Sequence, residues 1–482
     1  MFSASMVFDA FRDRLSGPDA LSRLRAGLIG AGRVIDAGYG PKPLLYADYT
    51  ASGRALQQIE QFVQEEVLPW YANTHTEASY CGMVSSQLRE EARRIIGRIT
   101  GAGADCHVIF AGNGATAGLN RIVQGLDIAE KIRAGKEVVV FTGPYEHHSN
   151  ILPWRESGAE IRVIPEGAEG GPDLKLLEAG LKDCAPGTLV IGTFTAASNV
   201  TGILCDTDAV TRLLKTNGAL AIWDYAAAAP YIPVSMGEGP AAKDAIVYSS
   251  HKFVGGPGAS GVLLLRKGLS WRQAPAQPGG GTVRFVSPWD AVYSDNLIAR
   301  EEAGTPDVIG DIRAALVLLV KEAIGAEVIA QQEHALRRQA LDAWRDHPRI
   351  ELLGLSEAAE ALPVFSFRIR DAGAGYVHHQ LFTRMLSDHA GIQVRGGCAC
   401  AGPYAHQLLG IDQPASQELW ARLQAGEEMA KPGWVRLNLS YIHAADQVAT
   451  ILESVADLAM RAPDLARDYT ADAAKARFRP AA

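Results

Sequence analysis

The sequence predicts an α/β fold, with a large domain built on a mainly parallel sheet and a smaller α+β domain after it. Two observations lead to this prediction. Short apolar runs alternate with helical patterns through the middle of the chain, and several runs are apolar throughout, as expected of strands covered on both faces. Beyond about Gly310, long amphipathic helices and short strands replace this alternation.

The predicted strands of the large domain are short and apolar. They cover residues 138–141, 161–164, 189–191, 220–223, 245–248 and 262–265. Helices are predicted over Ser86–Ile99, where the apolar residues share one stripe, and over Ala117–Gln124.

We expect three parts in the chain: an N-terminal segment (1–45), the large domain (46–310) and the small C-terminal domain (311–482). The small domain is predicted to contain helices over Ile312–Ala326 and Gln331–Trp344, a strand over Val364–Phe367, a helical insertion over 403–433 and a peripheral tail after Asp468.

Composition and charge limit the classes of function. The chain has 482 residues and a net charge of -8, which disfavours nucleic-acid and membrane-surface partners because both usually require basic patches. No stretch approaches the ~20 apolar residues of a membrane span, and the N-terminus lacks the apolar core of a signal peptide. We therefore expect a cytoplasmic protein whose six cysteines are reduced thiols.

Lys252 follows the predicted strand over 245–248 and ends the sequence Ser249-Ser250-His251-Lys252. A lysine at the end of a buried strand is partly desolvated, which favours a neutral, nucleophilic amine. Such an amine holds an aldehyde cofactor as a Schiff base. A solvated surface lysine is the alternative for this residue taken alone.

Other polar segments also follow predicted strands, where open α/β sheets gather ligands. The start of the helix at Ala115 and Thr116 suits a phosphate, because backbone N–H groups point outward there. Asp224 suits a protonated pyridine nitrogen, which keeps a pyridoxal ring electron-poor. Taken alone, the helix start is as consistent with a plain turn, and Asp224 with a helix cap.

Three further residues fit the same cofactor or its substrate. His147 can stack on a flat ring and relay protons, whereas zinc binding by His147 and His148 is disfavoured because adjacent extended side chains point apart. Asn199 can donate to a phenolic oxygen. Arg436, in an apolar strand, needs either a substrate carboxylate or an internal acid. A structural role for the histidine and a turn position for the asparagine stay open.

From about Tyr46 to Ile451, the chain resembles the class V branch of fold-type I pyridoxal-phosphate enzymes, and most closely the group II cysteine desulfurase/selenocysteine lyase family. The resemblance rests on ordered motifs: Tyr46-Ala47-Asp48-Tyr49-Thr50-Ala51, Glu146–Trp154, Ser198-Asn199-Val200-Thr201-Gly202, Asp224, Ser249–Lys252 and Glu302-Ala303-Gly304-Thr305-Pro306. It implies a seven-stranded-type sheet, pyridoxal 5′-phosphate as the cofactor and a homodimer.

The resemblance also implies a role for each residue. His147 would be the ring-stacking acid/base, Asp224 the partner of the pyridine nitrogen, and Lys252 the Schiff-base lysine. Arg436 would take the substrate carboxylate, and Asn199 would contact the cofactor and the substrate. The phosphate would be held by Ala115, Thr116, Ser249 and His251, with Thr305 of the partner subunit.

Cys400 matches the family's sulfur-accepting cysteine, counted from Arg395 to Pro403. Its thiolate would attack the sulfur of a cysteine–cofactor adduct and leave alanine and an enzyme persulfide. An unreactive buried cysteine is the alternative. Cys398 is a bystander, a resolving thiol or a metal ligand with Cys400, but two cysteines one residue apart do not justify a metal site, and we predict none.

Two departures from the family pattern concern the substrate. Ala227 stands where the family usually has a glutamine, and the connection between Cys400 and Arg436 is longer than the family's. The favoured function is nevertheless a pyridoxal-phosphate lyase that removes sulfur or selenium from a cysteine-like amino acid and passes it to an acceptor protein.

Three rival functions stay open. Another class V enzyme, such as an aminotransferase or an epimerase-like enzyme, would use Lys252 but not Cys400. A nicotinamide dehydrogenase is suggested by Gly27-Leu28-Ile29-Gly30-Ala31-Gly32, but Ile35 replaces the third glycine of that fingerprint. A non-catalytic binding protein on the same fold is disfavoured by the set of Lys252, Asp224 and His147.

Overall fold

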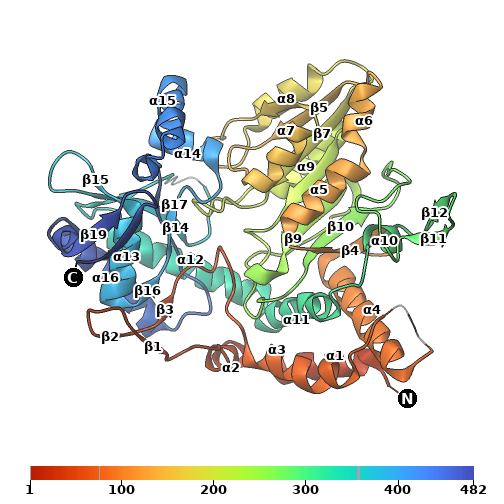
Figure 1. Cartoon of the computed structure of the whole chain (residues 1–482), viewed down its shortest axis with the longest axis horizontal. Coiled ribbons are helices and arrows are strands. Elements are labelled where there is room, and N and C mark those ends of the chain that lie inside the picture. The colour runs from red at the N-terminus through yellow and green to blue at the C-terminus, as the bar shows by residue number, and fades with distance from the viewer. Residues whose placement is uncertain (1, 75, 77, 355–358, 482) are drawn as a thin grey trace. The chain divides into compact units, whose positions relative to one another are not determined.

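The computed structural model describes residues 2–74, 76, 78–354 and 359–481, which form two compact units (Figure 1). The first unit comprises Met1–Ile29, Ser52–Ala196 and Cys205–Ala326, and the second comprises Gly30–Ala51, Ala197–Leu204 and Glu327–Ala482. The chain therefore enters the second unit at three separate places. The domain boundaries expected from the sequence, after residues 45 and 310, stay predictions.

A seven-stranded sheet forms the centre of the first unit, in the order β4-β10-β9-β8-β7-β5-β6. The strands from β5 to β9 run parallel, and β10 is antiparallel to both of its neighbours. This confirms the predicted mainly parallel sheet. The strands are β4 (Cys106–Gly112), β5 (Val138–Thr142), β6 (Glu160–Val163), β7 (Leu189–Thr195), β8 (Leu220–Asp224), β9 (Ala245–Ser249) and β10 (Gly261–Arg266).

Helices cover this sheet, so its central strands are buried on both faces. Every residue of β5 and β9 is buried. Helix α5 (Ala115–Gly125) packs on β9 and β10, and α9 (Thr207–Thr216) packs on β8. Because β5, β7, β8 and β9 are parallel, the segments that leave their carboxyl ends emerge at one edge of the sheet.

Two long helices of the first unit, α4 (Tyr80–Thr100) and α11 (Val308–Ile324), pack against each other. The hairpin of β11 (Val283–Val286) and β12 (Ala291–Tyr293) projects from this unit (Figure 1). The other helices of the unit are α1 (Ala4–Leu15), α2 (Ala20–Ala26), α3 (Gln57–Phe62), α6 (Ile128–Arg133), α7 (Leu152–Glu156), α8 (Leu174–Lys182) and α10 (Leu297–Glu301).

The second unit is the predicted α+β part of the fold. Its main sheet has the order β13-β14-β18-β17, with β15 paired to β14. Its apolar core includes Trp344, Phe367, Phe382 and Leu437. The elements are β13 (Ile350–Leu352), β14 (Val364–Arg370), β15 (Tyr376–Val377), β17 (Arg395–Gly397) and β18 (Trp434–Asn438), with helices α12 (Ala326–Trp344), α13 (His379–Ala390) and α16 (Ala445–Leu465). Three short strand pairs are also present: β1 (Val34–Asp36) with β2 (Pro41–Pro43), β3 (Leu45–Tyr46) with β16 (Ile392–Gln393), and β19 (Tyr469–Asp472) with β20 (Arg477–Pro480).

The tail is less peripheral than the sequence predicts. It forms the β19–β20 hairpin, and the Tyr469 ring is buried in the core of the second unit, where its hydroxyl donates to Asp388 Oδ2 at 3.1 Å. The predicted helical insertion is found as α14 (Gly402–Leu409) and α15 (Gln413–Gln424). None of the residues of α15 is buried, and the Trp420 side chain is 66% exposed. Within the described ranges, no helix is both long and apolar enough to cross a membrane.

Candidate active site

Lys252 ends a short 3-10 turn (Ser250–Lys252) that directly follows β9. The Gly53 N–H donates to the His251 carbonyl at 2.9 Å and so helps to fix this turn. Lys252 is half-buried. Burial raises the pKa of the Asp224 carboxyl and lowers the pKa of the His251 imidazole, and the charge of Lys252 acts to lower both pKa values, so the three side chains share one electrostatic environment.

Asp224 is the last residue of β8 and is only 3% exposed. Burial raises the pKa of its carboxyl, while a 2.8 Å hydrogen bond from the Ala226 N–H and the charge of Lys252 act in the opposite direction. A buried carboxylate of this kind is stabilised by a cationic partner.

The turn that follows Asp224 contains Ala227, at the position where a glutamine was expected from the family pattern. It is closed by a 2.7 Å hydrogen bond from the Ala229 N–H to the Tyr225 carbonyl. The buried amine of Lys321, on α11, donates to the Ala229 carbonyl at 2.6 Å and also to the Ile232 carbonyl. This internal lysine therefore anchors the backbone beside Asp224.

The start of α5 forms a narrow backbone cradle. Gly114 has φ +80°, and a Cβ there would lie 2.7 Å from Ser249 Oγ and 3.3 Å from His251 Cε1. The Ala115 N–H donates to Ser249 Oγ at 2.9 Å. The structure thus brings together Ala115, Ser249 and His251, as predicted from separate parts of the sequence, at a helix N-terminus suited to an anion.

His147 and Thr116 are connected through Ser149. The Thr116 and Ser149 hydroxyl oxygens are 2.7 Å apart, and Ser149 Oγ lies 3.0 Å from His147 Nδ1. The Ser149 N–H donates to the same ring nitrogen at 3.1 Å. His147 is half-buried, whereas Thr116 is exposed.

Glu146, which directly precedes this histidine, is a buried acid to which the sequence analysis assigned no role. Glu146 accepts from the backbone N–H groups of Gly143 and Thr195, at 3.2 and 2.9 Å, and from the Asn150 amide at 2.6 Å. Burial raises the pKa of Glu146 to about 8 despite these three donors. The network ties the segment after β5 to the end of β7, and so fixes the backbone on which His147 stands.

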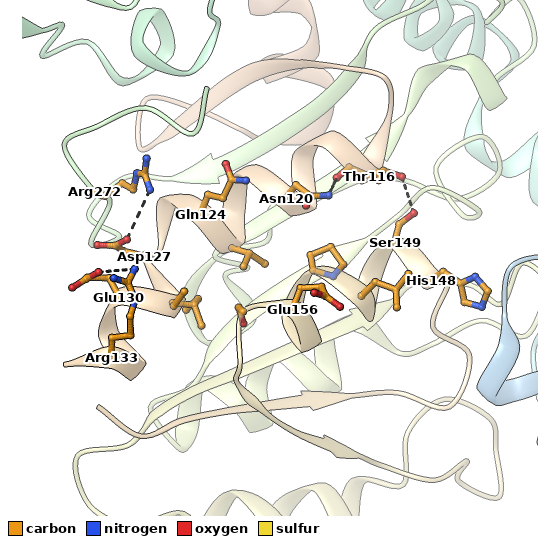
Figure 2. A pocket seen from close by; sticks show the side chains of 16 residues that line it. Thr116, Asn120, Gln124, Asp127, Glu130, Arg133, His148, Ser149, Glu156 and Arg272 are labelled. Atoms are coloured by element: carbon orange, nitrogen blue, oxygen red, sulfur yellow. Dashed lines mark hydrogen bonds and ion pairs between the residues drawn. The ribbon is translucent and has the colours of Figure 1, made fainter. Parts of the chain in front are cut away.

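A cavity of about 540 Å³ opens beside the hydroxyl pair of Thr116 and Ser149. Figure 2 shows both residues on its wall, with Asn120 and Gln124 farther along the same face of α5 and His148 next to Ser149. Asn120 Nδ2 donates to the Thr116 carbonyl at 2.9 Å. Much of the lining near Thr116 is therefore polar.

The second unit holds the predicted substrate-binding residues. Arg436, on β18, is 4% exposed, donates to Asp48 Oδ1 at 2.9 Å and donates to the Asn199 carbonyl at 3.1 Å. Arg395 donates to the other oxygen of Asp48 at 3.2 Å. Asp48 is therefore the internal acid that the sequence analysis allowed as a partner of Arg436. The binding of a substrate carboxylate by Arg436 stays a prediction.

Asn199 contacts the cysteine loop of the same unit. Its amide nitrogen donates to the Ala399 carbonyl at 2.8 Å, while its buried amide oxygen accepts no hydrogen bond from the part of the chain that the structure describes. Such an unsatisfied buried acceptor is rare in folded proteins.

Cys400 is exposed and lies in a strained turn. The Ala401 N–H donates to the Cys398 carbonyl at 3.2 Å, and both residues between them have positive φ, +53° at Ala399 and +55° at Cys400. Because the left-handed region costs a non-glycine residue about 1 kcal/mol, two consecutive cases mark a conformation that the surrounding structure imposes. Cys398 is half-buried.

Thr305 is exposed in the segment between α10 and α11. The structure therefore places its side chain where a second subunit can reach it, and the assigned contact in trans stays a prediction. Sequence reasoning missed Ser149, Glu146, Asp48 and Lys321 as parts of the site. Ser149, Glu146 and Asp48 lie inside motifs already singled out, whereas Lys321 is revealed only by burial.

The chain belongs to the class-V aminotransferase family, whose family model matches residues 45–450. It is 31% identical over 366 residues to a cysteine desulfurase of Klebsiella pneumoniae, with 75% of this chain and 85% of that protein covered. The predicted membership in the class V branch is thereby confirmed.

Two solved structures share the fold. An apo cysteine desulfurase from Thermococcus onnurineus superposes with a TM-score of 0.73 at 24% identity, covering 91% of this chain and 98% of the other. A cysteine desulfurase from Escherichia coli gives a TM-score of 0.69 at 22% identity, covering 92% and 98%. At these identities the likeness concerns the fold.

Proposed function

We propose that this protein is a pyridoxal-phosphate-dependent enzyme that takes sulfur from L-cysteine, releases L-alanine and holds the sulfur as a persulfide on Cys400. Family membership and the name of the Klebsiella relative support the reaction class. The observation that carries the proposal is the cysteine loop, where an exposed thiol stands on two consecutive left-handed residues. A merely structural cysteine needs neither exposure nor such a turn.

The residues of the first unit fit the cofactor. The cradle at Gly114, which a single Cβ would fill, matches a phosphate at the start of α5. The buried Asp224 carboxylate matches a protonated pyridine nitrogen, and the half-buried Lys252 amine matches the aldehyde. When bound, pyridoxal phosphate supplies an electron sink for the pair released at the substrate Cα.

The roles of the side chains follow from their chemistry. Lys252 would hold the cofactor through its aldehyde, and the Lys252 amine removes the Cα proton of the substrate. Asp224 keeps the pyridine nitrogen protonated. Arg436 binds the substrate carboxylate in addition to Asp48, and the cofactor contact of Asn199 uses the second hydrogen of its amide.

The sulfur transfer requires only one thiol of the enzyme, that of Cys400. The Cys400 thiolate forms a new S–S bond to the substrate sulfur, the C–S bond breaks, and the carbon that loses sulfur takes up a proton. Cysteine and the Cys400 thiol thus become alanine and a persulfide, with no other oxidant or reductant. An acceptor protein with a free thiol then removes the outer sulfur.

The active form that we propose is a homodimer in which Thr305 of the partner subunit completes the phosphate site. The exposed position of Thr305 supports this arrangement. The β11–β12 hairpin supports it too, because its Phe285 and Trp289 side chains are 59% and 91% exposed. Large apolar side chains gathered on a projecting hairpin are typical of a surface covered by a partner.

A second class V activity, amino transfer or epimerisation, is favoured by one observation. Ala227 stands in the turn anchored by Lys321, where the family glutamine would contact the cofactor. The loss of that contact changes how the cofactor's electrons are held, and such a change affects the reaction type.

The test measures alanine and sulfide released from L-cysteine by the purified protein with pyridoxal phosphate and excess reductant. Equal amounts of both products, lost in Cys400→Ser and kept in the matched control Cys398→Ser, are the expected result. Activity that survives Cys400→Ser would exclude a persulfide on Cys400. A protein that binds the cofactor but forms no alanine would instead favour the second activity.

A further inference from the structure

The contacts of His147 define where its proton lies. A backbone N–H can only donate, so the ring nitrogen that faces the Ser149 N–H at 3.1 Å, Nδ1, is an acceptor. Neutral His147 therefore carries its proton on Nε2. This assignment follows from backbone geometry and needs no assumption about the cofactor.

A histidine in this tautomer can give away the Nε2 proton only if Nδ1 gains one at the same time. Otherwise the ring becomes an imidazolate, which is not accessible near neutral pH. The Ser149 hydroxyl is placed to supply that second proton, because its oxygen lies 3.0 Å from Nδ1. The Thr116 hydroxyl, 2.7 Å from Ser149 Oγ, is placed to replace it.

The far end of this chain of hydroxyls opens on the cavity. Thr116 and Ser149 both belong to the wall of the 540 Å³ cavity, and Thr116 is exposed (Figure 2). Because Thr116 is exposed, solvent water reaches its hydroxyl directly. The path therefore has a proton source at one end and an imidazole nitrogen at the other.

We propose that Ser149 is a positioning residue that fixes the tautomer of His147 and relays protons to it from the cavity. As Nε2–H gives its proton to the substrate Cβ, the carbon that loses sulfur, the Ser149 proton passes to Nδ1 and the Thr116 proton passes to Ser149 Oγ. A hydronium ion or buffer acid from the solvent then reprotonates Thr116 and leaves as water or the conjugate base. One proton is moved in total, and no group is oxidised or reduced. The identity of the substrate rests on the proposed function; the relay itself does not.

The test compares Ser149→Ala with Ser149→Thr, which keeps the hydroxyl, and with Ser157→Ala, which removes another hydroxyl from the same cavity wall. The reaction followed is exchange of the Cβ hydrogens of L-alanine with D₂O, observed by proton NMR in the presence of pyridoxal phosphate. Exchange at Cα, where Lys252 removes the proton, is the internal reference. This exchange needs proton transfer but no sulfur chemistry, so it separates the relay from desulfuration.

We expect Ser149→Ala to slow the exchange and the release of alanine from L-cysteine by about 10²-fold, the contribution typical of one acid–base group. Ser149→Thr should recover most of the rate, and Ser157→Ala should match the wild type. The solvent isotope effect should fall in Ser149→Ala, since the hydroxyl protons no longer move. A purely structural role for Ser149 would leave the isotope effect unchanged.

An independent measurement follows the ring nitrogens of ¹⁵N-histidine-labelled protein, with the His147 signals assigned by His147→Gln. The expected result is an unprotonated Nδ1 and a protonated Nε2 in the wild type. A protonated Nδ1, or wild-type exchange in Ser149→Ala, would overturn the relay. If exchange depends on Ser149 while L-cysteine gives no alanine, the relay stands and the proposed function fails.

Discussion

Gly114 keeps the phosphate cradle open, because a single added carbon atom would fill it. Its φ of +80° is accessible to glycine, and an added Cβ would meet Ser249 Oγ at 2.7 Å. We expect Gly114→Ala to weaken pyridoxal phosphate binding at least about 10-fold and to cost about 1–3 kcal/mol of folding free energy. Cofactor absorbance titration and urea unfolding measure the two effects.

The matched control for this prediction is Gly135→Ala. Gly135 has φ +84°, yet an added Cβ there meets nothing within 4 Å. The control therefore shares the backbone strain of Gly114→Ala without filling the cradle. Equal cofactor affinity in the two variants would show that the cradle does not hold the phosphate.

Lys321 makes the stability of the fold depend on pH. Burial lowers the pKa of its amine from 10.5 to about 7 in the folded chain. Between about pH 7 and the unfolded value near 10.4, the folded state binds fewer protons, so the free energy of unfolding rises with pH by up to about 1.4 kcal/mol per unit. Below about pH 7 the amine is protonated in both states, so the free energy of unfolding no longer depends on pH through Lys321, and the stability gained at higher pH is absent.

We expect the free energy of unfolding of the wild type to rise relative to that of Lys321→Met as the pH rises from 7 to 9. Urea unfolding at three pH values measures it. Lys267→Met is the control, because Lys267 also donates to a backbone carbonyl, that of Ala104 at 2.7 Å, but is exposed. A pH-independent difference for Lys321→Met would contradict a lowered pKa.

At the scale of elements, one carboxylate fastens α4 to the segment that carries Thr305. Glu302 accepts from Arg89 at 2.6 Å, from Arg93 at 2.8 Å and from the Phe110 N–H of β4 at 2.7 Å. Its side chain is 7% exposed. Removing the negative charge leaves two buried guanidinium groups with less compensation, and we expect Glu302→Gln to lower the free energy of unfolding by about 3 kcal/mol.

The comparison for Glu302→Gln is Glu322→Gln. Glu322 accepts two hydrogen bonds from Arg98, at 2.6 and 2.8 Å, but the two side chains are 34% and 50% exposed. An exposed pair contributes less than about 1 kcal/mol. Similar losses in both variants, measured by urea unfolding, would show that burial does not set the strength of the Glu302 network.

The strands were predictable where the sequence alone carries their signal. The central strands β5 and β9 are continuous apolar runs whose residues are all buried. Each of the parallel strands β5 to β9 lies within a few residues of its predicted range. Strand β4 was not predicted. Its sequence begins Cys-His and ends in a glycine, and its pairing with β10, far along the chain, is what defines it.

At the scale of the whole molecule, the motif residues were predictable but their connections were not. Asp224 ends a strand, and Lys252 and His147 each follow one, so parallel topology places them at one edge of the sheet. The Ser149 contact with His147 Nδ1, the Asp48 pair of Arg436 and the amine of Lys321 depend on side-chain directions and burial, which one sequence does not encode locally.

The division of the chain into units was also beyond sequence reasoning. Residues 30–51 and 197–204 belong to the second unit although they precede and interrupt the segments of the first. Neither segment differs in composition from its surroundings, so no sequence pattern marks where the chain passes from one unit to the other. Only the contacts of the folded chain define such a discontinuous unit.

The proposed dimer makes a prediction about which subunit supplies Thr305. Lys252→Ala removes the Schiff-base amine, and Thr305→Asp places a negative charge where we propose a phosphate contact. Each variant alone should be inactive in alanine release. If Thr305 acts on the partner subunit, a hybrid dimer has one site with both defects and one intact site, because the Lys252→Ala subunit still provides a normal Thr305.

Co-expression of the two variants with different tags, followed by purification of the hybrid, tests this arrangement. The hybrid should recover about half of the wild-type activity per dimer, since one of two symmetric sites is intact. If Thr305 acted within its own subunit, each site of the hybrid would carry one defect and no activity would return. The Thr305→Ser hybrid with Lys252→Ala is the control, because it keeps the hydroxyl and should reach the same half activity.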